Sequence, residues 1–307
     1  MSDSILDSIH INFDSQSLWV LNSALALVMF GIALDISISD FKKLAKNPKP
    51  IFIGAFSQFF MLPLVTFLLV LIIKPIPSVA LGMFMVAACP GGNISNFITH
   101  FSNGNSALSV CLTAIATLLA VFLTPYNLNF WGSLYSPTAV LLKQVAIEPL
   151  DMVKLVFLLL GIPLFLGVLI NHYKPIFAKK SAYILKYVSL VFFIILIFLA
   201  LYKNIDIFLN YILYVFWIVV IHNIIAFATG FSLAKAFGLS VENTKAITIE
   251  TGIQNSGLGL LLIFTFFNGL GGMALLTAFW GIWHLISGLV LANLWRNKNN
   301  MIKRKLT

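Results

Sequence analysis

The sequence predicts an all-α polytopic membrane protein with nine transmembrane helices, two of them interrupted within the membrane. The chain is 60% hydrophobic and only 9% charged, whereas a soluble domain carries about 25% charged residues. Its apolar residues gather in stretches of about 20, the length that crosses a bilayer. Its basic residues gather in the short connections between those stretches, so the net charge of +9 follows from membrane orientation and does not require a nucleic-acid partner. No obligate protein partner is indicated.

The predicted spans follow from length and hydropathy. They are 18–36, 50–73, 78–101, 105–125, 152–172, 183–202, 207–230, 243–267 and 272–294. Residues 1–17 are polar and acidic, and they are predicted to form an extracytoplasmic tail. Residues 126–151 carry aromatic side chains among polar ones and are predicted to be an outer loop or an interfacial helix. Together with the fifth helix they make a connector, 126–182.

Lysine and arginine are unevenly divided between the two sides of the membrane. Most of the 19 basic residues lie in four places, 37–49, 173–186, 235–245 and the tail 295–307. Positive charges favour the cytoplasmic side. The C-terminus is therefore predicted in the cytoplasm and the N-terminus outside. An odd number of spans likewise places the two termini on opposite sides.

Two spans carry helix-breaking residues at matching places. The third contains 90–96, with the sequence PGGNISN, and the eighth contains 251–256, with the sequence TGIQNS. Proline removes a backbone donor and glycine weakens a helix, so both segments should unwind. One such break is typical of an ordinary kink. Two breaks in spans of opposite direction favour an inverted repeat, helices 1–4 (18–125) against helices 6–9 (183–294).

Glu250 is the only acidic residue deep inside an apolar segment. A charge at that depth costs at least about 2.5–3.5 kcal/mol, so such residues are usually functional. Oxygen-bearing side chains near the breaks, together with unwound carbonyls, suit a sodium ion. These side chains belong to Gln58, Ser95, Asn96, Ser109, Thr113, Glu250 and Gln254. Two alternatives stay open: Glu250 takes up a proton, or Ser109 and Thr113 bond only to their own helix.

The half-helices that restart after the breaks point positive dipole ends toward the crossing, which suits an anion. Coupled transport of a cation and an organic anion follows. His222 and His284 are either packed, hydrogen-bonded residues or, for His284 above all, part of a substrate cavity. The chain shows no zinc-binding His-Glu-x-x-His helix, no intramembrane pair of acids and no Ser–His dyad, so an enzyme is not expected. A proton-coupled carrier, a passive carrier and a channel are the rivals.

The motifs resemble the bile acid:sodium symporter family, specifically a bacterial member of the apical sodium-dependent bile acid transporter type. The resemblance rests on 89–96 (CPGGNISN), 104–110 (GNSALSV), 248–257 (TIETGIQNSG) and Gln58 within 58–63 (QFFMLP). It extends from about residue 20 to residue 295. It implies a location in the bacterial inner membrane. It also implies a panel domain, here spans one, two, five and six, and a core domain that contains the other spans.

The resemblance further implies two sodium ions. The first would be held by Ser95, Asn96, Ser109, Thr113 and Glu250. The second would be held by Gln58, Glu250, Gln254 and the carbonyls of Thr251 and Ile253. The anion would lie near Asn93, Ile94, Asn255 and Ser256. Because the family pattern Trp-His-Asn ends in Leu285 here, a small carboxylate such as pantoate or ketopantoate stands beside a bile acid-like steroid conjugate as the expected substrate.

Overall fold

The structure is a computed structural model that describes residues 5–9, 15–36, 47–145, 149–185, 187–188, 191 and 205–306. Every named element in that part of the chain is a helix. Five helices in it are long and apolar enough to cross a membrane: Lys49–Ile73, Ser106–Leu134, Leu150–Tyr173, Leu209–Ala236 and Gly271–Arg296. The predicted all-α membrane class is therefore confirmed. Nine spans remain a prediction, and most of the sixth, 183–202, lies outside the described residues.

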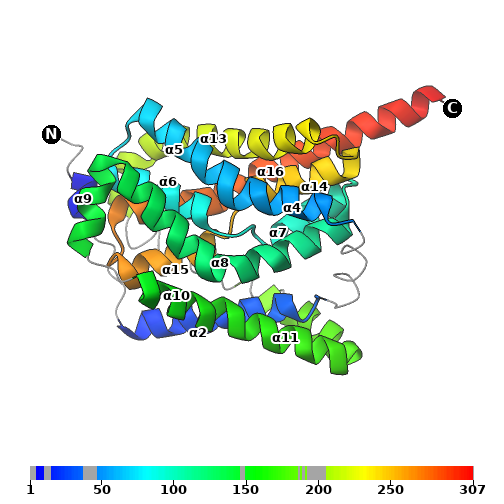
Figure 1. The fold of residues 1–307 in the computed structure, drawn as a ribbon, viewed down its shortest axis with the longest axis horizontal. Coiled ribbons are helices and arrows are strands. Elements are labelled where there is room, and N and C mark those ends of the chain that lie inside the picture. The colour runs from blue at the N-terminus through cyan, green and yellow to red at the C-terminus, as the bar shows by residue number, and fades with distance from the viewer. Residues whose placement is uncertain are drawn as a thin grey trace.

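A smaller group of helices lies along one side of the molecule, at the bottom of Figure 1. It contains α2 (Ser15–Ala33) and the continuous helix made of α10 (Pro149–Val156), η2 (Phe157–Gly161) and α11 (Ile162–Tyr173). Residues 175–185 are also helical. Gly167 of α11 lies so close to Ala33 that a side chain there would collide with it. Small residues let membrane helices approach in this way.

A larger group forms the other side, and it includes the second predicted span. Here α4 (Lys49–Phe56), η1 (Ser57–Met61) and α5 (Leu62–Ile73) make one helix with a π turn in its middle. The expectation that this span belongs with spans one, five and six is wrong. Its Gln58 bonds to Gln254 and to the carbonyl of Cys89. A buried amide needs such partners, and they all lie in the larger group.

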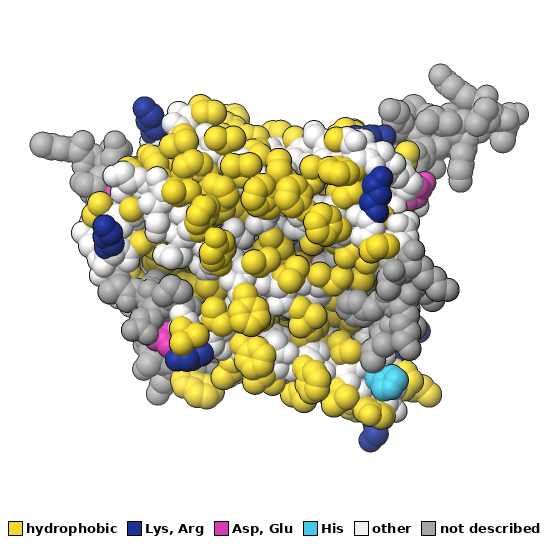
Figure 2. Space-filling view, in the orientation of Figure 1, with side chains coloured by type: hydrophobic (Ala, Val, Ile, Leu, Met, Phe, Trp, Pro, Cys, Tyr) yellow, Lys and Arg dark blue, Asp and Glu magenta, His cyan; other side chains and the backbone are white. Residues whose placement is uncertain are grey.

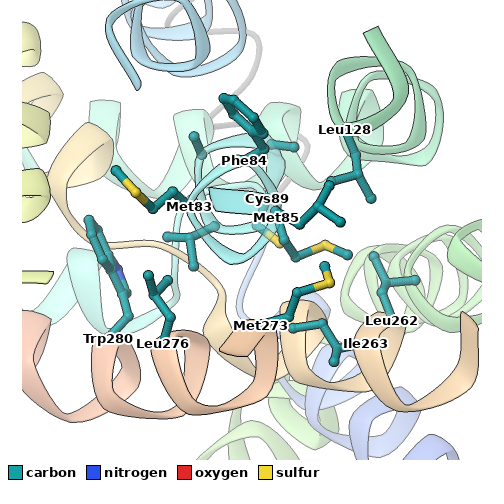
Figure 3. Close-up of a cluster of buried hydrophobic side chains, with 14 of the residues drawn as sticks. Met83, Phe84, Met85, Cys89, Leu128, Leu262, Ile263, Met273, Leu276 and Trp280 are labelled. Atoms are coloured by element: carbon teal, nitrogen blue, oxygen red, sulfur yellow. The ribbon is translucent and has the colours of Figure 1, made fainter. Parts of the chain in front are cut away.

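Both predicted helix breaks are observed. The third span divides into α6 (Pro77–Ala88) and α7 (Ile94–Phe101), and the eighth into α14 (Val241–Gly252) and α15 (Ser256–Phe266). Behind the breaks, α6 and α15 pack against α16 (Gly271–Leu306) through a dry core. Figure 3 shows side chains of this core, among them Phe84, Ile263 and Trp280. This core fixes the half-helices from behind.

The fourth span is longer than predicted. Its helix α8 (Ser106–Leu134) continues past Pro125, and α9 (Ser136–Val145) follows, so 126–151 is not an open loop in its described part. Two polar residues of this region, Asn127 and Thr138, are buried and paired. Asn127 donates to the carbonyl of Phe59 in the π turn, 3.0 Å away, and accepts from Trp131 at 3.1 Å. Pro63 cannot donate to the carbonyl of Phe59 one turn earlier, and Asn127 satisfies that carbonyl from a neighbouring helix.

The N-terminal segment packs on the larger group. Leu6 of α1 (Ile5–Ser8) is fully buried. Asp7 accepts a hydrogen bond from the backbone nitrogen of Ser78 at the start of α6, 2.8 Å away. The carbonyl of Ile9 accepts from the nitrogen of Gly271 at the start of α16, also at 2.8 Å. The described part of the predicted tail therefore caps two helices.

The surface has the character expected of a membrane protein. In Figure 2 hydrophobic side chains cover the middle of the visible face, and most Lys and Arg residues lie toward its ends. Large apolar residues such as Phe52, Ile72 and Phe122 are mostly exposed. Apolar exposure on this scale is typical of a lipid-facing surface. In Figure 1, α13 (Ile205–Ala236) runs along the top of the view, beside α5 and α14.

At the other end of the crossing, a buried lysine joins the two broken spans. Lys245 of α14 is only 4% exposed. Its Nζ donates to the carbonyl of Ser102 at the end of α7, 2.6 Å away. Near this contact, Nδ2 of Asn105 donates to Oδ1 of Asn243, 2.8 Å away. The amine thus caps the negative end of α7.

Replacing Lys245 with methionine should lower the stability of the protein by about 1–3 kcal/mol, because a charge-assisted hydrogen bond is lost and a carbonyl is left unpaired. Thermal unfolding in detergent would measure the loss. Lys235→Met is the matched control, because Lys235 is exposed on the surface of α13. Equal melting temperatures for the two variants would contradict the capping role.

Candidate functional site

The two breaks cross through their backbones. The nitrogen of Gly92 donates to the carbonyl of Ile253 at 2.7 Å, and the nitrogen of Asn255 donates to the carbonyl of Pro90 at 2.8 Å. A Cβ on Gly92 would lie 2.8 Å from the backbone oxygen of Gln254, so glycine is needed for this approach. The two unwound segments thus satisfy each other's backbone hydrogen-bonding groups, and the helix ends beside them meet at one point.

Glu250, in the last turn before the second break, lies at the centre of a buried cluster. Its side chain is 2% exposed. Ser95 donates to Oε2 at 2.6 Å and Thr113 donates to Oε1 at 2.8 Å. Ser109 lies 3.5 Å from Oε2. Three hydroxyl groups from α7 and α8 therefore surround one carboxylate of α14.

Asn96 completes this cluster. Its Oδ1 accepts from Ser109 at 2.8 Å and from Thr113 at 3.2 Å. Thr113 also lies 3.1 Å from the carbonyl of Ser109, one turn earlier. The shortest contact of the Thr113 hydroxyl is the one to Glu250, so bonding within its own helix does not account for its orientation. All five residues assigned to the first sodium ion lie in one hydrogen-bonded group.

A second polar group lies on the other side of the crossing. Gln58 donates to Oε1 of Gln254 at 2.7 Å, and Gln254 donates to the carbonyl of Thr251 at 2.6 Å. Three of the predicted second-site residues are thus together. The carbonyl of Ile253 is occupied by the backbone pairing. Among the described residues, the carboxylate of Glu250 bonds to the first group and not to either glutamine.

Four groups in this region were missed by sequence analysis. Ser57 lies 2.9 Å from the hydroxyl of Thr251, and the carbonyl of Cys89 accepts from Gln58 at 2.8 Å. Asn223 donates to the carbonyl of Gly252 and accepts a hydrogen bond from Ser287. A polar residue inside an apolar span is a detectable signal for Asn223. No sequence pattern indicates that Ser57 turns inward, because that depends on the π turn.

The residues assigned to the anion lie at the two helix starts. Asn93 precedes α7, and its buried Oδ1 has no hydrogen-bond partner. Asn255 caps α15 by accepting from the nitrogen of Leu258 at 3.0 Å, and its amide faces the sulfur of Met29 at 3.9 Å. Ser256 begins α15, whereas Ile94 packs in an apolar cluster with Ile98 and its neighbours.

The two intramembrane histidines differ in their surroundings. His222 is 2.7 Å from the hydroxyl of Thr66 and packs edge-on against Trp280, as a structural residue would. His284 is 5% exposed, and its Nδ1, like that of His222, lacks a partner. It shares a face of α16 with Gly281, where a Cβ would lie 2.7 Å from the hydroxyl oxygen of Ser256. His284 therefore belongs to the face of α16 that packs on the second break.

The chemistry of the first cluster fits a hard monovalent cation. One carboxylate is combined with hydroxyl and amide oxygens, the ligand type that hard cations prefer. No group of three or more His, Cys, Asp or Glu side chains suited to a metal occurs among the described residues. A transition-metal site is therefore not indicated in that part of the chain.

Comparison with known proteins agrees with this chemistry. The chain is 31% identical over 297 residues, 96% of its length and 88% of the relative's, to the uncharacterised sodium-dependent transporter YocS of Bacillus subtilis. It is 29% identical over 89% of its length and 65% of the relative's to the probable chloroplastic sodium/metabolite cotransporter BASS1 of Arabidopsis thaliana. It is 30% identical over 78% of its length and 67% of the relative's to the human ileal sodium/bile acid cotransporter. The model of the sodium bile acid symporter family matches residues 23–211, and the chain belongs to this family.

Proposed function

We propose that the protein is a sodium-coupled symporter that imports an organic anion by alternating access. The observation that carries the proposal is the shell around Glu250. A buried carboxylate contacts three hydroxyl groups, and two of these also bond to the amide oxygen of Asn96. The group offers a cation five oxygen-bearing side chains and a full compensating charge. A bound ion would neutralise a charge that is costly at membrane depth.

Two ions are proposed. The first lies among Ser95, Asn96, Ser109, Thr113 and Glu250. Hydroxyl groups that now donate to the carboxylate rotate so that their oxygens face the ion. The second lies beside the Gln58–Gln254 pair and the carbonyls of Thr251 and Ile253. There the amide pair must open, because the nitrogen of each glutamine bonds to the oxygen of the other, at 2.7 and 3.4 Å.

The anion is proposed to bind where α7 and α15 begin. Both helix ends direct a partial positive charge to this point. The unpartnered Oδ1 of Asn93 and Nδ1 of His284 offer an acceptor and, in one tautomer, a donor for the rest of the substrate. A small carboxylate such as pantoate or ketopantoate fits these groups, and a bile acid-like steroid conjugate is the second candidate.

Alternating access would move the two helix groups against each other. The smaller group, α2 with α10–η2–α11 and the sixth span, would form the panel, and the crossing lies in the core. The two groups meet where Met29 of α2 faces Asn255. We further propose nine spans in an inverted repeat, with the N-terminus outside. Interrupted helices at matched positions of inverted halves are a recurring transporter design.

Uptake into proteoliposomes tests the proposal. Labelled pantoate and labelled taurocholate would be offered with an inward sodium gradient, with an equal potassium gradient, and with a proton gradient alone. A sodium symporter accumulates at least one anion only in the first condition. Accumulation driven by protons would favour the proton-coupled alternative. Equilibration without accumulation would favour a passive carrier or channel.

Removing the amide of Gln254 should separate the two ions. With Gln254→Leu we expect uptake to need about tenfold more sodium, since part of one ligand shell is lost. The sodium dependence should also change from sigmoidal toward hyperbolic, because a Hill coefficient cannot exceed the number of coupled sites. Gln144→Leu, an exposed amide on α9, is the control. An unchanged sigmoidal curve for Gln254→Leu would remove Gln254 from the second site.

A further inference from the structure

The end of α14 is held by a polar chain that reaches in from two other helices. Asn223 of α13 is fully buried, and its Nδ2 donates to the carbonyl of Gly252 at 2.8 Å. Ser287 of α16 donates to Oδ1 of the same amide at 2.6 Å. The last carbonyls of a helix have no partner within it, and here one of them is satisfied by a side chain.

The orientation of this amide is set by chemistry. A carbonyl only accepts hydrogen bonds, so the nitrogen of Asn223 must face Gly252 and its oxygen must face away. That oxygen meets the hydroxyl of Ser287, which supplies the hydrogen it needs. Ser287 thereby holds the amide in the one orientation that serves Gly252, and a buried polar chain of this kind is rigid when every member is satisfied.

The backbone of α13 and α14 is close enough to transmit this restraint. A Cβ on Gly252 would collide with the ring of Phe227, which lies one turn from Asn223 on the same face of α13. A Cβ on Gly230 would lie 2.9 Å from the carbonyl of Ile247. Three positions of α13, at 223, 227 and 230, therefore contact the last turns of α14 directly.

The carbonyl of Gly252 lies between the two carbonyls assigned to the second ion. Peptide units are planar and adjoining units share only two rotations at each residue. Fixing the carbonyl of Gly252 therefore restricts the directions of the carbonyls of Thr251 and Ile253. Without Asn223, the freed carbonyl could turn toward the cation site or toward another donor, and its neighbours would turn with it.

We propose that Asn223, oriented by Ser287, is a positioning residue for the second sodium site. It touches neither the ion nor the substrate, and acts by holding the unwound end of α14 in the shape that presents two carbonyls to the ion. The inference rests on the proposed function, since it concerns a site of that transporter. It predicts that loss of either side chain weakens sodium binding in a protein that still folds.

The test is a sodium chloride titration of the purified full-length protein in detergent, with potassium chloride keeping the ionic strength constant. Tryptophan fluorescence gives the melting temperature at each sodium concentration. For Asn223→Leu, of similar size, we expect the half-saturating sodium concentration to rise about tenfold, and for Ser287→Ala about threefold, as expected for losing or loosening one buried hydrogen bond. The melting temperature without sodium should fall for Asn223→Leu, because the buried carbonyl of Gly252 loses its donor, and the inference requires that the sodium midpoint rise as well.

Thr229→Val is the matched control, because Thr229 lies on the same helix and bonds only back to the carbonyl of Ile225. Unchanged sodium midpoints in both test variants would overturn the inference, as would a lower sodium-free melting temperature with an unchanged midpoint. If Asn223→Leu does not fold, Ser287→Ala decides alone. An unaltered protein that shows no sodium response would overturn the proposed function itself, so the two failures are distinguishable.

Discussion

Replacing Glu250 with glutamine is expected to abolish sodium-driven uptake and to weaken sodium binding at least about 100-fold, which is about 2.8 kcal/mol. Glutamine keeps the shape of the side chain but removes the negative charge that compensates the cation. Sodium-dependent thermal stabilisation and uptake into proteoliposomes would both measure the loss. The sodium-free protein should fold, because the hydroxyl groups of Ser95 and Thr113 can rotate to accept from the new amide.

Glu242→Gln is the control for this variant. Glu242 lies on the same helix, α14, but it is in the first turn of that helix and its side chain is exposed. The control should keep its sodium response. Retention of sodium-driven uptake by Glu250→Gln would contradict the central role of the carboxylate, and would shift the argument to the neutral oxygens around it.

Alanine at the two glycines of the first break is expected to give two different defects. At Gly92 the new Cβ would lie 2.8 Å from a backbone oxygen, that of Gln254. Backbone cannot move aside locally, so the crossing should separate and lose both of its interstrand hydrogen bonds. We expect Gly92→Ala to lower stability by about 2–6 kcal/mol, because two backbone hydrogen bonds are broken and each loss costs about 1–3 kcal/mol.

At Gly91 the new Cβ would instead meet the side chain of Glu250, with its Cδ at 2.7 Å. A side chain can move, but only by leaving the hydroxyl groups that hold it. Gly91→Ala should therefore fold with a smaller loss of stability, and need about tenfold or more sodium for half-maximal stabilisation. Thermal unfolding with and without sodium separates the two defects. A larger loss of stability for Gly91→Ala than for Gly92→Ala, or equal losses for both, would show that the crossing is not packed as described.

Much of the candidate site was predictable because its signals are local. Glu250 is conspicuous as a charge in an apolar stretch, and Pro90, Gly91 and Gly252 indicate breaks from their own backbone chemistry. The polar residues of 89–96 and 248–257 then follow by proximity in sequence. For the same reason both breaks were placed correctly without knowing what crosses them.

Other features depended on partners distant in sequence. The second span was assigned to the wrong helix group even though the resemblance placed Gln58 beside Gln254, because hydropathy does not show which helices a span packs against. The region after Pro125 was interpreted as a loop or interfacial helix, because nothing local shows that Asn127 bonds to the π turn at Phe59. A polar side chain that suggests contact with solvent in the sequence can instead bond to another helix in the structure.

The sequence by itself determined that this chain is helical, crosses membranes, breaks two of its helices and carries one buried carboxylate beside those breaks. Each of these follows from hydropathy, proline and glycine chemistry, or charge, which act within a few residues. Only the tertiary structure decided that both breaks pair through their backbones, that five oxygen-bearing side chains from three helices meet at Glu250, and that Asn223 and Ser287 hold the end of α14. Those contacts join residues that lie 13 to 165 positions apart, and packing alone brings them together.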